Sequence, residues 1–159
     1  MKLTTSNGVP LTAVEPLSDG GQNAVVLTVA ESEDLAIKFF LEPDEDLRSR
    51  LAAMMNHQAA KAWAYGNGER LRMTWPLELV LEEQTGDTVG YVMPLLGGNR
   101  DLFELAEPEG ATGDFANFSW RRLVNACWHL ASTVEGLHQQ GIIAQDQREN
   151  SNCHAGVIS

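Results

Sequence analysis

The stretch that decides the fold is Val25 to Phe40, which reads Val-Val-Leu-Thr-Val-Ala-Glu-Ser-Glu-Asp-Leu-Ala-Ile-Lys-Phe-Phe. Two apolar runs flank a short acidic turn, a pattern that predicts two strands joined by that turn. Lys38 is the single cation of the second run. Because burying an unpaired charge is very costly, a lysine in this position either has an anion close by or belongs to an edge strand and extends to water. Upstream, Gly20 and Gly21 belong to a turn of small and polar residues, Ser18 to Asn23.

Length, charge and cysteine content limit the classes of protein to which the chain can belong. It has 159 residues, of which 43% are hydrophobic, and a formal net charge of -11. That length suits one domain or two small lobes that share a hinge. The acidity predicts that the protein does not bind nucleic acid, because no basic stripe is present to displace counterions.

The location of the protein is predicted from what the sequence lacks. Residues 1–7 have no apolar core of a signal peptide, and no apolar run approaches membrane-spanning length. The two cysteines, Cys127 and Cys153, do not suggest a disulfide framework. We therefore expect a cytoplasmic protein that does not bind membranes.

The local pattern predicts five strands and one or two helices before residue 97. Runs rich in Val, Leu and Thr predict strands at residues 9–17, 24–30, 35–41, 73–82 and 88–95. Pro76 lies inside the fourth run, which favours an edge or bulged position. Pro43 and the acids that follow it are typical of the first turn of a helix. The apolar spacing of residues 47–55 continues that helix, with a break or a second short helix before residue 66.

The longest predicted helix covers residues 120–140, with Ser119 as its N-cap and Gly141 as its terminator. Its apolar residues fall on an arc of roughly 200°, wider than the ~100° stripe of a surface helix. Such a helix is expected to have neighbours on more than one side. Gly97-Gly98-Asn99 is the clearest break in the pattern, and we place a boundary there between residues 1–96 and 97–159.

Three short motifs complete the pattern. They are Trp75-Pro76-Leu77-Glu78-Leu79, Val89-Gly90-Tyr91-Val92-Met93-Pro94 and Trp120-Arg121-Arg122-Leu123-Val124. Together with the lysine strand, their order resembles a protein kinase domain, and more narrowly a bacterial Ser/Thr kinase-like branch with WP, GxxMP and GD-type catalytic-loop motifs. The resemblance covers nearly the whole chain. It implies an α+β fold in which a kinase-like N-lobe, with a five-stranded antiparallel sheet, is followed by the start of a helical C-lobe.

The resemblance also implies roles at the phosphate end of an ATP-binding cleft. Lys38 resembles the lysine that pairs with the nucleotide phosphates and with a glutamate of the following helix. Glu45 and Asp46 are both candidates for that acidic partner. Gly20 and Gly21 resemble the first part of a Gly-rich loop, whose backbone amides approach phosphate closely.

Further roles concern the adenine and the catalytic loop. Met93, Pro94 and Leu95 resemble the hinge, whose backbone hydrogen-bonds an adenine ring, and the resemblance implies that Val25 and Ala36 cover the faces of that ring. Asp146 resembles the catalytic-loop aspartate that accepts the proton of the substrate hydroxyl.

Two departures reduce the activity that the resemblance implies. In the degenerate catalytic loop, residues 141–152, Ser151 stands where a kinase has a magnesium-binding asparagine. The sequence as given ends at Ser159, before an Asp-Phe-Gly segment, whose aspartate holds magnesium in kinases. We therefore expect a truncated or inactive kinase-like domain, with ATP binding that is weak or independent of magnesium and no efficient phosphoryl transfer.

An alternative is a non-enzymatic interaction module, in which the helix at residues 120–140 binds a partner protein or a second copy. Leaving three or four large apolar side chains in water costs on the order of 5 kcal/mol, so association is expected for either function. Metal binding is not expected, because the spacing of the candidate ligands matches no metal motif. Those candidates are His129, His138, Cys153 and His154.

Overall fold

The computed structural model describes residues 1–17, 23–65, 73–95 and 120–142. The chain divides into two compact units, Met1–Leu96 and Gly97–Ser159. The first unit is a sheet with two helices, and the described part of the second unit is one long helix. Each unit is considered by itself.

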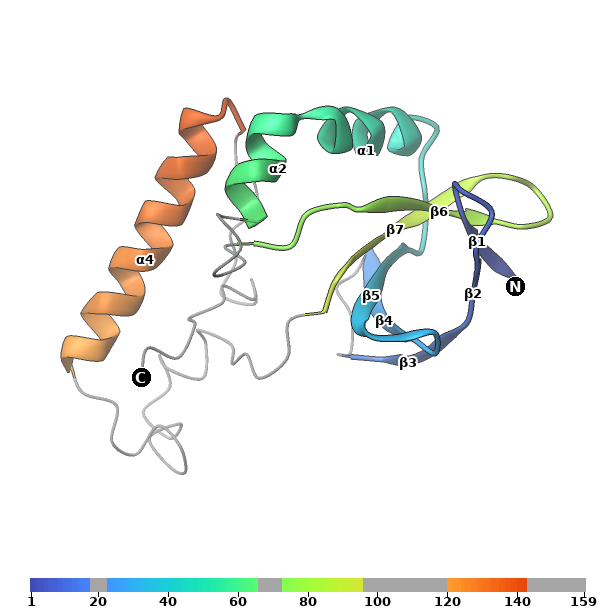
Figure 1. Cartoon of the computed structure of the whole chain (residues 1–159), viewed down its shortest axis with the longest axis horizontal. Coiled ribbons are helices and arrows are strands. Elements are labelled where there is room, and N and C mark those ends of the chain that lie inside the picture. Colours follow the sequence, from blue (N-terminus) through green and yellow to red (C-terminus); the bar gives the residue numbers. More distant parts are fainter. Residues whose placement is uncertain (18–22, 66–72, 96–119, 143–159) are drawn as a thin grey trace. The chain divides into compact units, whose positions relative to one another are not determined.

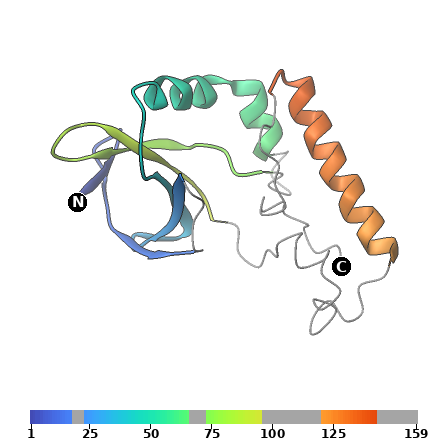
Figure 2. The same ribbon diagram turned by 180° about the vertical axis from the view of Figure 1, so that it is seen from behind.

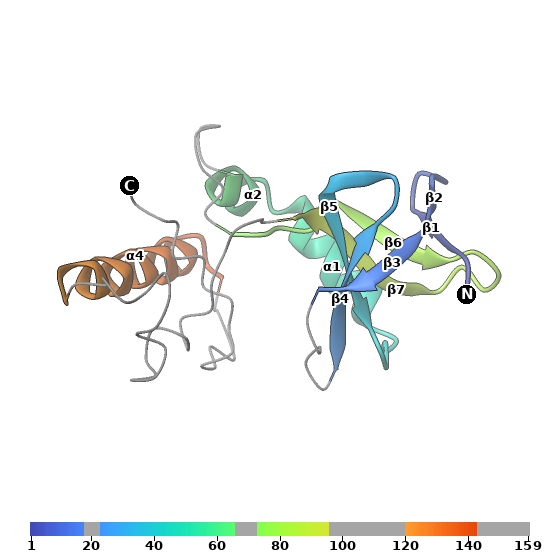
Figure 3. The same ribbon diagram turned by 90° about the horizontal axis from the view of Figure 1, so that it is seen from below.

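The first unit contains one antiparallel sheet with seven strands (Figures 1 and 3). The strands are β1 (Leu3–Thr5), β2 (Pro10–Leu11), β3 (Ala13–Pro16), β4 (Ala24–Val29), β5 (Ser32–Phe40), β6 (Glu78–Glu82) and β7 (Thr88–Pro94), in the order β2-β1-β6-β7-β5-β4-β3. The expectation of five strands is therefore wrong. The sequence pattern missed β1 and treated β2 and β3 as one strand.

The additional strands nearly close the sheet on itself. Strands β2 and β3 lie at the two ends of the strand order, yet only Thr12 separates them along the chain. Pro10 and Leu11 pair with β1, whereas Ala13 and Pro16 pair with β4. The backbone N–H of Ala30 donates to the carbonyl of Thr12 at 3.0 Å, so both sides of the junction are held. One short segment thus joins the two ends of the sheet, and Figure 1 shows β2 running directly into β3.

Alternation along the strands separates two apolar clusters. The barrel core consists of Leu3, Val29, Ile37, Val80, Val89 and Val92, with Leu27 and Phe39 among the side chains packed against it. The second cluster, here called the helix-side cluster, consists of Leu47, Leu51 and Leu79, with Phe40, Met55, Leu81 and Tyr91 packed against them. Period-two alternation therefore places successive residues of β5 on different faces.

Two helices follow β5 in the chain (Figures 1 and 2). They are α1 (Leu47–Asn56) and α2 (Gln58–Tyr65), which confirms the predicted helix with a break. The break lies at His57, whose backbone N–H donates to the carbonyl of Met54 and whose Nδ1 accepts from the N–H of Ala60. His57 thus ends one helix and caps the next.

The start of α1 differs from the prediction. The acids at positions 44–46 were expected in the first turn of the helix, but α1 begins at Leu47 and its first turn contains no acid. Pro76 likewise lies before β6 instead of inside it.

The long helix of the second unit is α4 (Trp120–Gln139), which confirms the predicted helix. It ends in a Schellman motif. The N–H of Ile142 donates to Leu137, the N–H of Gly141 donates to His138, and Gly141 takes a left-handed φ of 75°. This agrees with the predicted role of Gly141, whereas the proposed N-cap, Ser119, lies outside the described residues. None of the described helices has both the length and the apolar character that a membrane span requires.

Candidate functional site

Lys38 lies in the middle of the sheet, near the end of β5. Its cross-strand partners are Val26 on β4 and Tyr91 on β7. Because directly opposite residues share a face, the Lys38 side chain is on the same side as Tyr91, which belongs to the helix-side cluster. The lysine is half-buried, and its Nζ lies 6.0 Å from the centroid of the Phe40 ring. The cation is therefore set among apolar and aromatic groups on the face that α1 covers.

Two more predicted site residues share this face. Ala36 is two residues before Lys38, is fully buried, and lies directly opposite Met93 on β7. Met93 is also buried. The structure thus brings together Lys38, Ala36 and Met93, which we call the lysine face.

Val25 does not belong to the lysine face. It pairs with Phe39, whose side chain packs against the barrel core, so Val25 and Ala36 lie on opposite faces of the sheet. On β4, Val26 lies directly opposite Lys38 and Thr28 directly opposite Ala36, so both share the lysine face. Sequence reasoning missed Val26 because its face depends on the register of the β4–β5 hairpin.

The backbone directly after β7 forms a hydrogen bond within the sheet. The N–H of Leu95 donates to the carbonyl of Asp34 at 2.7 Å. This bond extends the pairing of β5 with β7 by one residue beyond Pro94. Of the predicted hinge residues Met93, Pro94 and Leu95, the last therefore has its N–H bonded within the sheet.

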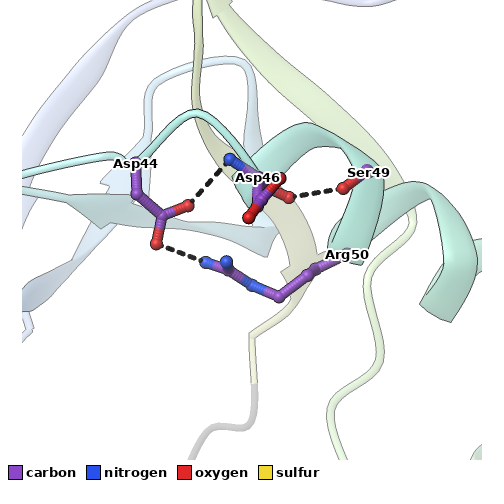
Figure 4. Close-up of polar contacts among 4 residues, drawn as sticks. All are labelled: Asp44, Asp46, Ser49 and Arg50. Carbon is purple, nitrogen blue, oxygen red and sulfur yellow. Dashed lines mark hydrogen bonds and ion pairs between the residues drawn. The ribbon is translucent and has the colours of Figure 1, made fainter.

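Side-chain hydrogen bonds hold the acidic turn that precedes α1 (Figure 4). The Asp44 carboxylate accepts from the backbone N–H of Asp46 at 3.1 Å and from Arg50 Nη2 at 2.9 Å. The Ser49 hydroxyl donates to the Asp46 carbonyl at 2.8 Å. The hydrogen bond from Arg50 lowers the pKa of the Asp44 carboxyl below its ordinary value, and the same contact with Asp44 raises the pKa of the Arg50 guanidinium.

The predicted acidic partner of Lys38 is not found on α1. Glu45 and Asp46 both precede the helix and are exposed, and α1 and α2 contain no Asp or Glu. Among the described residues the ion pairs are Lys2–Glu83 and Arg50–Asp44, so Lys38 forms none with that part of the chain. No carboxylate of the described residues therefore pairs with the Lys38 ammonium.

Trp75 connects the helices to the sheet. Its side chain is only 1% exposed, and its Nε1–H donates to the carbonyl of Met54 in the last turn of α1 at 3.1 Å. The Tyr65 hydroxyl, at the end of α2, donates to the Trp75 carbonyl at 3.4 Å, and burial raises the pKa of Tyr65. The Trp-Pro motif therefore fixes both helices at the entry to β6, a role that its sequence did not reveal.

Gly90 allows β7 to approach Lys38 closely. A Cβ atom at this position would lie 2.2 Å from the Lys38 carbonyl oxygen and 3.2 Å from the Phe39 Cα. The register also shifts here, since Val80 pairs with Gly90 whereas Leu81 pairs with Thr88. Such bulges re-aim neighbouring side chains, and this one directly precedes Tyr91. Gly90 was quoted in a motif, but its contact with Lys38 was not anticipated.

Three predicted site residues lie outside the described residues. They are Gly20, Gly21 and Asp146. The described residues hold no group of three or more His, Cys, Asp or Glu placed to bind a metal ion. His154 and Cys153 are also outside that part of the chain.

Comparison with known proteins identifies the fold. The chain is 24% identical to "Protein kinase YegI" of Escherichia coli K12 over 152 residues, which is 95% of this chain and 22% of that protein. The O157:H7 form is also 24% identical, over 94% of this chain and 22% of its own length. The crystal structure of a Toxoplasma gondii rhoptry antigen kinase domain superposes with a TM-score of 0.56 and 14% identity, over 88% of this chain and 45% of that one. No family model matches the sequence.

This chain has a protein kinase-like fold. Together with the strands and helices of the described residues, the structural comparison confirms the α+β class. The chain spans about a fifth of the length of the curated relatives.

Proposed function

We propose that the chain is a kinase-like domain that binds a nucleoside triphosphate, with the phosphates at Lys38. The observation that carries this proposal is the lysine face, where Ala36, Lys38 and Met93 lie on neighbouring strands of a kinase-like sheet. Small and apolar groups beside a cation suit a ligand with a flat base and an anionic tail. Among the described residues, no carboxylate pairs with Lys38 that could also bind magnesium beside the phosphates. We therefore propose that nucleotide binding does not depend on magnesium.

The proposed binding is tested by thermal unfolding of the full chain with ATP, with and without magnesium. ATP at ten times its Kd stabilises the folded state by about 1.4 kcal/mol, which raises the Tm of a unit of this size by roughly 6–11 °C. Lys38→Met should abolish the increase. Lys2→Met is the matched control, because Lys2 is an exposed lysine of the same unit and lies beside Glu83. An equal loss of the ATP effect in both variants would contradict the assignment to Lys38.

We further propose that phosphoryl transfer is slow or absent, since the magnesium-binding asparagine of kinases is replaced by Ser151. The test is transfer of radiolabelled phosphate from ATP to the chain itself and to a general protein substrate. No transfer above background is expected. Rapid transfer that Asp146→Asn abolishes would overturn this part of the proposal and establish Asp146 as a catalytic residue.

A second candidate function is association through α4. Trp120 is 78% exposed and Trp128 is 63% exposed, and the exposed Val124 lies between them at helical spacing. We propose a second copy of this chain as the occupant, because burying each large side chain contributes about 2 kcal/mol and a symmetric pair gains this twice. Sedimentation at micromolar concentration should give a dimer that dissociates in the Trp120→Ser/Trp128→Ser variant. Arg121→Ser is the matched control on the same helix, and a monomeric wild-type chain would exclude this candidate.

A further inference from the structure

The described surroundings of Lys38 contain aromatic rings where a kinase would place a carboxylate. Phe40 is two residues further along β5, on the same face, with its ring centroid 6.0 Å from Lys38 Nζ. Tyr91 lies directly opposite Lys38 on β7. The Phe40 and Tyr91 centroids are 6.3 Å apart with an interplanar angle of 49°. The ammonium, the phenyl ring and the phenol ring therefore form one connected group.

Helix α1 fixes these two rings through apolar contacts. Phe40 and Tyr91 both pack against the helix-side cluster, to which α1 contributes Leu47 and Leu51. The aromatic pair is thus braced between the sheet and the helix. Burial also raises the pKa of the Tyr91 phenol to about 12, so this ring stays neutral beside the lysine at physiological pH.

We propose that Phe40 and Tyr91 are positioning residues that hold the Lys38 ammonium, in place of a carboxylate on α1. This proposal rests on the function proposed for Lys38. An aromatic face attracts a cation through its quadrupole, and 6.0 Å is at the outer end of the effective range. Unlike a carboxylate, the ring does not neutralise the cation. Phe40 and Tyr91 therefore bring no negative charge that would repel an anionic phosphate group, and α1 acts on Lys38 through packing alone.

The direct test is NMR of the Lys38 side-chain Hε protons in the full chain without nucleotide. Ring currents should move these signals upfield from their free-lysine positions, and nuclear Overhauser effects should connect them to the Phe40 ring. Phe40→Leu should return the signals towards the free positions, whereas Phe40→Trp should retain the displacement. This measurement on the wild-type protein stands even if a variant fails to fold.

The effect on binding is measured by titration with ATP. Phe40→Leu should weaken binding roughly two- to five-fold, the range that corresponds to an exposed cation–aromatic contact. Tyr91→Phe retains the ring and should change the affinity less than two-fold. Phe39→Leu is the matched control, because Phe39 is the next residue of β5 but packs against the barrel core. It should lower stability while leaving the Lys38 signals and the relative affinity unchanged.

The outcomes separate the positioning role from the nucleotide function. Free-lysine Hε shifts in the wild-type protein, or equal effects of Phe39→Leu and Phe40→Leu on those shifts, would overturn the positioning role. Ring-current shifts without any response to ATP would support the positioning role and reject nucleotide binding at Lys38.

Discussion

Replacement of Gly90 by Ala should displace the strand that carries Lys38. The new Cβ would lie 2.2 Å from the Lys38 carbonyl oxygen. Ordinary van der Waals contact of a Cβ atom begins at 3.4 Å, so β5 and β7 must separate locally by about 1 Å. The opposing atom is backbone and cannot rotate away. Overpacking of this kind costs about 3 kcal/mol, which lowers the Tm of a unit of this size by roughly 12–24 °C.

Gly86 offers a matched control in the turn between β6 and β7. It has a φ of 75° and open space around its Cβ position, so Gly86→Ala should cost about 1 kcal/mol through backbone strain alone. Asn tolerates this left-handed conformation, so Gly86→Asn should cost less than Gly86→Ala. At Gly90 we expect the reverse, so that Asn costs more stability than Ala, because Asn is larger and the opposing backbone leaves no room for a side chain.

Urea denaturation followed by far-UV circular dichroism measures these differences, and ATP titration reports the effect on Lys38. Gly90→Ala should lose both stability and ATP binding. Wild-type stability in Gly90→Ala, or a larger loss in Gly86→Ala, would refute the steric explanation.

Three further substitutions test separate contacts. Trp75→Phe removes the hydrogen bond to Met54 and part of a fully buried ring, so it should lower the free energy of unfolding by about 2–3 kcal/mol in urea; a loss below about 0.5 kcal/mol would contradict the connecting role. Tyr91 has a pKa raised from 10.0 to about 12, so the unfolded state loses the phenol proton at a lower pH than the folded state does. The free energy of unfolding should therefore fall by up to roughly 3 kcal/mol as pH rises from about 10 to 12. Tyr91→Phe should remove this decrease from alkaline unfolding curves. Asp44 has a lowered pKa, so its carboxylate stabilises the folded state above the ordinary carboxyl pKa, and this stabilisation is lost as pH falls through the pKa of the folded state. The Tm difference between wild type and Asp44→Asn should therefore vanish in acid. A difference that stays constant with pH would exclude the Arg50 contact as its cause.

Local sequence patterns predicted most of the individual elements but not the number of strands. The runs at residues 24–30, 35–41 and 88–95 correspond to β4, β5 and β7 within a few residues. Strand β1 was missed because its three residues carry little local signal. It is held by pairing with β6, as in Leu3 opposite Glu82. Pairing between residues so far apart in sequence is not encoded in either segment alone.

Within the site, residue types were more predictable than faces and contacts. The apolar run around Lys38 correctly predicted a strand, β5, whereas the role of the lysine itself stays a prediction. Whether Val25 or Val26 joins it depends on the hairpin register, and a shift of one residue reverses the face. The role of the acids before α1 was also hidden, because α1 begins only at Leu47 and Asp44 contacts Arg50 from outside the helix.

The junction at Thr12 has a consequence for the order of assembly during synthesis. Strand β1 can pair with β2 as soon as both have been made, but its other partner, β6 (Glu78–Glu82), follows much later in the chain. Until β6 is made, β1 and β2 can pair only with each other, whereas β3, β4 and β5 can already form their part of the sheet. Closure of the sheet through β1 and β2 is thus expected to come last, after β6 and β7 have been made.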